Sequence, residues 1–178
     1  MSRLLIVAYP KISKPDFEWI QDHRRKYDEL SYQAVPPHFT LFFPSAEFKS
    51  DDLFQIAKRN IGSFPSFQFS LRSAMIMPRL VGEYSYVFLV PDEGFSQIIQ
   101  LHDKIYGNEL SSSLRLDIPF VPHVTVASSK NVAVCKELVD ALNNKKFEIT
   151  GKIQTLDIVF EDGDRITTLS QIHLSPGE

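Results

Sequence analysis

Two short stretches, Pro37-His38-Phe39-Thr40-Leu41 and Pro122-His123-Val124-Thr125-Val126, share one pattern: proline, histidine, an apolar residue, threonine and a second apolar residue. In a β-strand successive side chains alternate between the two faces, so the histidine and threonine of each stretch share one face. A single histidine of this kind can be an ordinary buried residue at a strand end. The probability that the whole pattern occurs twice by chance among 178 residues is on the order of one in ten thousand.

The first motif contains His38 and the second contains His123. The two histidines lie 85 residues apart, which is about half the chain. Around each of them the order strand, helix, motif strand, helix, strand, strand occurs once. This repeat predicts two similar lobes of mixed α/β structure within one domain that spans residues 1–178. A pseudo-twofold relation between the lobes would place both His-Thr pairs across a groove, where ligand sites tend to lie.

Local signals predict the individual elements. The apolar run of residues 3–9 predicts a buried strand, and Ser13-Lys14-Pro15-Asp16 predicts the start of a helix, with a serine cap and an early proline. The later expected elements are a strand over 38–43, a helix over 50–61, strands over 67–71 and 84–90, a helix over 95–105, a strand with the second motif, a helix over 131–142 and a hairpin of 147–160 with 166–174.

The first helix is expected to pack with one apolar face. Its members at helical spacing are Phe17, Ile20, His23, Tyr27 and Leu30. We expect the charged residues of the same segment to form a solvated face. These are Arg24, Arg25, Lys26, Asp28 and Glu29.

Composition limits the partners. A hydrophobic fraction of 43% and a charged fraction of 23% are those of an ordinary globular domain. The net charge of −3 argues against wrapping of long nucleic acid and favours a small or terminal phosphate ligand. The only cysteine, Cys135, cannot form an internal disulfide, and the apolar run after Met1 is too short to span a membrane. We therefore expect a cytoplasmic location, no membrane partner and no obligate protein partner.

Two histidines and two threonines across a groove are suited to phosphodiester chemistry. Near neutral pH one imidazole can be neutral while the other is protonated, which is the minimum for paired acid and base catalysis. Two hydroxyl groups can donate hydrogen bonds to the non-bridging phosphate oxygens. This set requires neither a metal nor another cofactor, and it is suited to the opening of a cyclic phosphodiester.

The duplicated His-x-Thr motif, each copy preceded by proline, resembles the two-histidine (2H) phosphoesterase superfamily, which includes 2′-5′ RNA ligase-like proteins and cyclic phosphodiesterases. The similar segments are Arg24-Arg25-Lys26-Tyr27-Asp28, residues 35–44 around the first motif and residues 117–127 around the second. The resemblance implies an α+β fold with two pseudo-symmetric lobes, each a mostly antiparallel sheet with outer helices, around a central groove. Several RNA ligase-like members carry an arginine shortly after the second motif, where this chain continues Ser128-Ser129-Lys130.

By the same resemblance, His38 and His123 are expected to be the catalytic acid and base, in an order that the sequence leaves open. Thr40 and Thr125 are expected to bind the phosphate. Tyr9, at the end of the first strand, and Phe120, which flanks the second motif, are candidate contacts for a nucleotide base. The implied substrate is a nucleotide or RNA end that carries a 2′,3′-cyclic phosphate.

Two other functions compete with this one. A module that binds nucleotides or RNA ends with little turnover could keep the same groove. The two histidines favour the enzyme, because arginine and lysine bind phosphate better than titrating imidazoles do. A two-histidine metal site is a third alternative, but neither motif supplies a carboxylate or second histidine at ligand spacing, and insensitivity to a chelator would argue against it.

Overall fold

The computed structural model describes residues 3–163 and 165–177 of the chain. Its strands are β1 (Arg3–Ala8), β2 (Lys11–Ile12), β3 (Phe39–Ser45), β4 (Phe67–Val81), β5 (Tyr84–Glu93), β6 (Val124–Ser129), β7 (Ile149–Ile153), β8 (Thr155–Asp162) and β9 (Arg165–His173). Its helices are α1 (Lys14–Tyr27), α2 (Ser50–Ile61), α3 (Phe95–Ile105), the 3₁₀ helix η1 (Asn108–Ser113) and α4 (Val132–Asn144).

Side-chain caps account for where two of the helices begin. The Ser13 hydroxyl accepts a hydrogen bond from the backbone N–H of Asp16, so α1 begins as the sequence predicts. The Asn131 side chain accepts from the N–H of Ala133 and caps α4 in the same way. Helix α2 ends at Ile61 and is capped by Gly62, whose positive φ of 58° is one that glycine adopts without strain.

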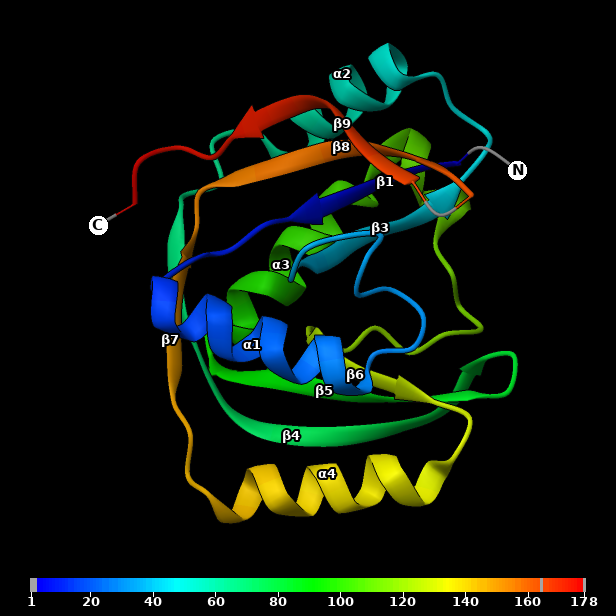
Figure 1. The fold of residues 1–178 in the computed structure, drawn as a ribbon. Helices are drawn as coiled ribbons and strands as arrows, with labels where there is room; N and C mark the ends of the chain where they lie inside the picture. Colours follow the sequence, from blue (N-terminus) through cyan, green and yellow to red (C-terminus); the bar gives the residue numbers. More distant parts are fainter. Residues whose placement is uncertain (1–2, 164, 178) are drawn as a thin grey trace.

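The strands form two sheets, each belonging to one lobe (Figure 1). The first sheet has the order β3-β1-β8-β9 and the second the order β2-β7-β4-β5-β6, and the strand pairs within both are antiparallel. Helix α4 covers the second sheet on the side away from the first, while α2 and α3 lie by the first sheet. The predicted α+β architecture with two antiparallel lobes is confirmed.

The two lobes exchange strands. Strand β4 comes from the N-terminal half of the chain but lies beside β5 in the second sheet, and β8 comes from the C-terminal half but lies beside β1 in the first. The single strand expected over residues 147–160 is therefore wrong. It is divided at Gln154 into β7, which pairs with β4, and β8, which pairs with β1.

The two motif strands have equivalent places. Strand β3 pairs with β1, which comes before α1 in the chain, and β6 pairs with β5, which comes before α3. The pairing is also irregular at the same place, because a register shift directly precedes Val7, the partner of Thr40, and Phe88, the partner of Thr125. This local symmetry confirms the internal repeat.

The face of α1 differs from the expected one. Arg24 and Asp28, expected in solvent, are 1% and 7% exposed, whereas Phe17 and Leu30 of the expected apolar face are 38% and 47% exposed. The reason is that α1 ends at Tyr27 and its last turn packs beside β6, where polar partners from distant segments surround the two charges. No helix among the described residues is long and apolar enough to cross a membrane.

Candidate active site

Each motif histidine is held by a hydrogen bond of the same kind, from its Nδ1 to a backbone carbonyl. The Nδ1 of His38 lies 2.8 Å from the carbonyl oxygen of Pro36, and the Nδ1 of His123 lies 2.6 Å from that of Val121. A carbonyl oxygen only accepts, so each Nδ1 carries the hydrogen and the lone pair of the neutral ring is at Nε2. The bond runs back two residues in both cases, and it fixes the same tautomer in both rings.

Aromatic side chains orient the two rings further. Phe88 of β5 lies flat against His123, with ring centroids 3.5 Å apart and planes 13° apart. Tyr9 meets His38 edge to face, with centroids 6.2 Å apart. Each imidazole is thus fixed by a backbone carbonyl and a neighbouring aromatic ring.

Both histidines are partly exposed, but the protein atoms around them still favour their neutral form. Desolvation lowers the pKa of His38 and of His123 to about 4, and the hydrogen bonds to Pro36 and Val121 only partly oppose it. The charge of His38 also lowers the pKa of His123, so the two rings are close enough to interact electrostatically. The site therefore has two coupled imidazoles that a bound anion would help to protonate.

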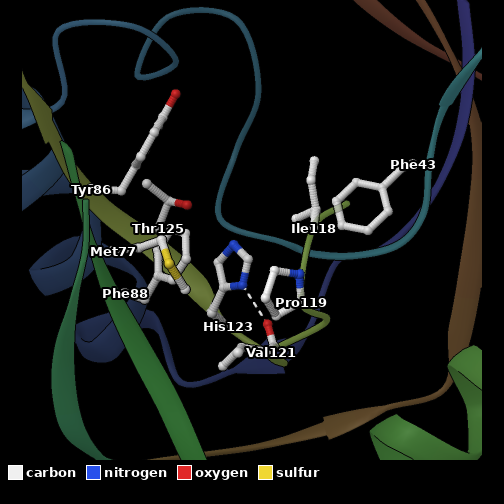
Figure 2. A pocket seen from close by; sticks show the side chains of 9 residues that line it. All are labelled: Phe43, Met77, Tyr86, Phe88, Ile118, Pro119, Val121, His123 and Thr125. Atoms are coloured by element: carbon white, nitrogen blue, oxygen red, sulfur yellow. Dashed lines mark hydrogen bonds between the residues drawn. The ribbon is translucent and has the colours of Figure 1, made fainter. Parts of the chain in front are cut away.

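A cavity of about 190 Å³ adjoins the second motif. Figure 2 shows His123 in the middle of its lining, with Thr125, Tyr86, Met77 and Phe88 on one side and Ile118, Pro119 and Phe43 on the other. Val121 completes the lining. Apart from the imidazole and the hydroxyl groups of Thr125 and Tyr86, the side chains are apolar, so the cavity is suited to a flat apolar group next to a polar centre.

The candidate residues are placed in two groups. His123 and Thr125 line the cavity, while His38 lies with Tyr9 at the first motif and acts on His123 through its charge. Phe120 does not line the cavity, because it stacks on the buried His102 with centroids 3.7 Å apart. Phe120 thus packs against the core on one side, and its contact with a nucleotide base stays a prediction.

Sequence reasoning missed the aromatic wall of the cavity. The sequence pattern places Tyr86 and Phe88 only in a strand. The signal was present, since Tyr84, Tyr86 and Phe88 alternate and share one face of β5. The sequence pattern of β5 does not show that this face adjoins the second motif, because that depends on the pairing of β5 with β6.

Binding of an anion should be linked to proton uptake. Because a negative charge stabilises the imidazolium form, sulfate, whose own charge is constant in this range, should bind up to about tenfold more tightly per pH unit as the pH falls from about 8 to about 5. Isothermal titration calorimetry in buffers of different ionisation enthalpy measures both the affinity and the protons taken up. His123→Gln should reduce the slope, and an affinity independent of pH would contradict the expectation.

No group of three or more histidine, cysteine, aspartate or glutamate side chains in the described part of the chain could hold a metal ion. Each motif supplies one imidazole and one hydroxyl group, those of His38 and Thr40 and those of His123 and Thr125.

The sequence and the fold were compared with known proteins. A sequence model of the 2′-5′ RNA ligase superfamily matches residues 12–165, which is most of the chain. The protein belongs to this superfamily, a branch of the two-histidine phosphoesterases and RNA ligase-like enzymes, as its motifs predict. No match was found among the curated proteins.

Solved structures with the same fold include E. coli LigT in apo form, with a TM-score of 0.64, 20% identity and coverage of 98% of this chain and 99% of that one. LigT complexed with 3′-AMP gives a TM-score of 0.64 at 18% identity, covering 97% and 98% of the two chains. The protein TT0787 of Thermus thermophilus gives 0.63 at 15% identity, covering 99% and 100%. At these identities the likeness concerns the fold.

Proposed function

We propose that this protein is a metal-independent phosphodiesterase that opens ribose 2′,3′-cyclic phosphates of RNA ends or nucleotides. The whole chain would act as one two-lobed domain in the cytoplasm. The observation that carries the proposal is the matched pair of histidines, each with its Nδ1 bonded to a backbone carbonyl and its Nε2 lone pair left for chemistry.

The reaction follows from these groups. The Nε2 of one imidazole takes a proton from water, and the water oxygen forms a bond to phosphorus. The bond from phosphorus to one ribose oxygen breaks, and the other histidine, in its imidazolium form, donates a proton to that oxygen. The hydroxyl groups of Thr40 and Thr125 donate hydrogen bonds to the non-bridging oxygens, where negative charge increases in the transition state.

The anionic substrate itself would prepare the acid. With both pKa values lowered to about 4, nearly all imidazoles are neutral at neutral pH. A phosphodiester anion between the rings raises the pKa of whichever ring it contacts, so binding and protonation are coupled. The second ring stays neutral because the two positive charges would repel each other.

The cavity supports a nucleotide over a bare phosphodiester. Its apolar walls can take a nucleobase, and its position beside His123 would place the base next to the reacting phosphate. In the same fold, LigT has been crystallised with 3′-AMP, with ATP and with NADP+, all of which carry a base and phosphate. We infer that this chain takes its base in the cavity at the second motif.

The test is turnover of 2′,3′-cyclic nucleotides and of an RNA oligomer with a cyclic phosphate end, with a chelator present. The wild type and a His38→Ala, His123→Ala double variant are compared, and the product isomer is identified by chromatography. Turnover by the wild type alone would support the mechanism. Binding of nucleotides without turnover would instead identify the protein as a binding module, and loss of activity on chelation would favour the metal site.

Ile118 allows a test of the base site. Ile118→Asn removes apolar surface from the cavity and should raise the KM for a 2′,3′-cyclic nucleotide by roughly 5- to 30-fold, while kcat changes little. Leu116→Asn, on the same loop but 88% exposed, is the matched control and should behave like the wild type. Steady-state kinetics with base-free ribose 2,3-cyclic phosphate should show no difference among the three proteins. An equal KM increase for that substrate would place the base elsewhere.

A further inference from the structure

A buried ion pair joins the end of α1 to the segment that leads to the first motif. The side chains of Arg24 and Asp28 are 2% and 0% exposed, and Nε of the arginine lies 3.3 Å from Oδ2 of the aspartate. Removing two charges from water costs more than such a pair commonly returns, and well-packed apolar side chains would often stabilise the fold as well. The pair therefore calls for an explanation other than stability.

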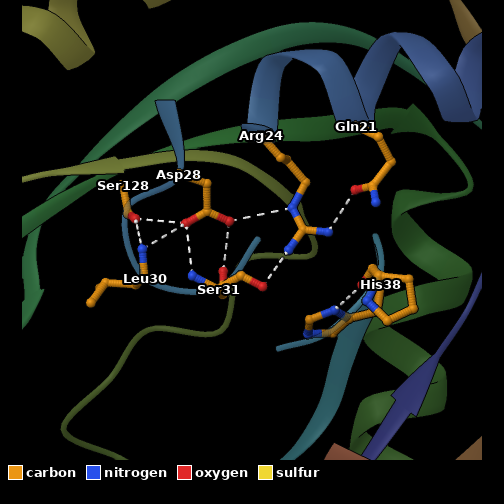
Figure 3. A network of polar contacts seen from close by, with 8 residues as sticks. Gln21, Arg24, Asp28, Leu30, Ser31, His38 and Ser128 are labelled. Atoms are coloured by element: carbon orange, nitrogen blue, oxygen red, sulfur yellow. Dashed lines mark hydrogen bonds and ion pairs between the residues drawn. The ribbon is translucent and has the colours of Figure 1, made fainter. Parts of the chain in front are cut away.

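The carboxylate of Asp28 accepts hydrogen bonds from two parts of the chain that are far apart in sequence (Figure 3). Its Oδ1 accepts hydrogen bonds from the N–H of Leu30 at 3.3 Å, the N–H of Ser31 at 3.1 Å and the hydroxyl of Ser128 at 2.6 Å. Its Oδ2 accepts from the Ser31 hydroxyl at 2.7 Å and from Arg24. This carboxylate thus connects the segment before the first motif with the strand of the second.

Ser128 makes that connection specific to β6. It lies three residues after Thr125 on the same strand, and its backbone forms a parallel bridge with Asp28. Its carbonyl accepts from the N–H of Glu29 at 3.2 Å, and its hydroxyl accepts from the N–H of Leu30 at 3.1 Å. On its other side Ser128 lies opposite Tyr86, which lines the cavity.

Arg24 folds the segment that carries His38. Its Nη2 donates to the carbonyl of Ser31 at 2.9 Å, and that same oxygen accepts from the N–H groups of Ala34 at 3.1 Å and Val35 at 3.2 Å. The next residue, Pro36, supplies the carbonyl that holds Nδ1 of His38. The guanidinium lies on the side of the network nearer His38 in Figure 3, and the remaining Nη1 contact is to Gln21 at 3.0 Å.

We propose that Arg24, Asp28 and Ser128 form a latch that positions His38 of the first lobe relative to Thr125 and the cavity of the second. We assign none of the three a catalytic role. Asp28 ties the segment before β3 to β6, and Arg24 sets the turn from which the Pro36 carbonyl orients the imidazole. The kinetic part of this inference rests on the proposed function, whereas its structural part concerns His38 itself.

The charges of the latch provide a signature that packing alone would not produce. Arg24 lowers the pKa of His38 and Asp28 raises it, with the effect of Arg24 the larger. The other influences on His38 are desolvation and its bond to Pro36, and the coupled group is His123. Arg24→Met should therefore raise the pKa of His38, and Arg24→Lys should restore it.

The experiment compares Arg24→Met, Arg24→Lys and Ser128→Ala with the control Arg25→Met. Arg25 is the next residue on α1, but it is exposed and pairs with Asp22 and Tyr32 at the surface. Steady-state kinetics should show kcat reduced on the order of 10- to 100-fold in Arg24→Met and less in Ser128→Ala, with KM nearly unchanged, since misplacement of a catalytic group affects mainly the chemical step. NMR titration of the His38 ring should show the pKa changes stated above.

Each outcome of these measurements supports or contradicts the proposed latch. If Arg24→Met does not fold, as judged by circular dichroism, Ser128→Ala and Arg24→Lys carry the test because each removes less. Folded variants with wild-type kcat and an unchanged His38 titration would show that the network is only structural. If the wild type turns over no cyclic phosphate, the proposed function fails, and the His38 titration together with affinity for inorganic phosphate still tests the latch.

Discussion

His38→Ala and His123→Ala are each expected to lower the turnover of a ribose 2′,3′-cyclic phosphate by roughly 100-fold or more, the usual scale for loss of a positioned acid or base. Both proton transfers accompany a single displacement at phosphorus, so the double variant should be little worse than either single one. Thr40→Ala and Thr125→Ala should have smaller effects, because each removes one hydrogen bond and no proton transfer. The measurement is the rate of nucleotide hydrolysis at saturating substrate, for each of the five variants and for the wild type.

His23→Ala is the matched control for this series. His23 is also bonded through Nδ1 to a backbone carbonyl, that of Trp19 at 2.8 Å, but it belongs to α1 and to no motif. Its loss should leave kcat unchanged. Full activity in either motif variant would disprove the two-histidine mechanism, and a fall only in the yield of folded protein would show that residue to be structural.

Asp28→Ala should lower the free energy of unfolding by about 3 to 5 kcal/mol, because it leaves the Arg24 guanidinium buried without a counter-charge. It also removes the acceptor shared by Leu30, Ser31 and Ser128. Urea unfolding followed by circular dichroism measures the change. The wild-type slope with urea should be kept if both proteins unfold in one step.

Two comparisons identify the cause of that loss. Asp22→Ala breaks an exposed pair with Arg25 and should cost less than about 1 kcal/mol. The double variant Arg24→Met, Asp28→Leu removes both charges and should recover much of the stability, because no uncompensated charge remains. A cost below about 1 kcal/mol for Asp28→Ala would mean that water or another group solvates Arg24.

Local sequence patterns predicted the elements because their causes lie within a few residues. The Ser13 cap bonds an N–H three residues away, and the alternation of each motif is a property of one strand. The symmetry of the motifs could be predicted for the same reason. The superfamily that the motifs predicted is confirmed by a sequence model that matches residues 12–165, most of the chain.

Pairings between distant segments were not predictable in this way. The apolar alternation of residues 147–160 does not show that β7 and β8 belong to different sheets, because that depends on which partner strand is free. Likewise, the choice between Phe120 and Phe88 as a neighbour of the site depends on loop packing, since Phe120 meets His102 and Phe88 meets His123.

The sequence by itself therefore predicted the two His-x-Thr strands, most of the helices and strands in their order, and the superfamily. Tertiary structure alone decided that Arg24 and Asp28 are buried, and that the cavity lies at the second motif. The physical reason is that a charged side chain on a helix is solvated unless another segment supplies its partners. Here those partners include Ser128, 100 residues from Asp28 in the chain.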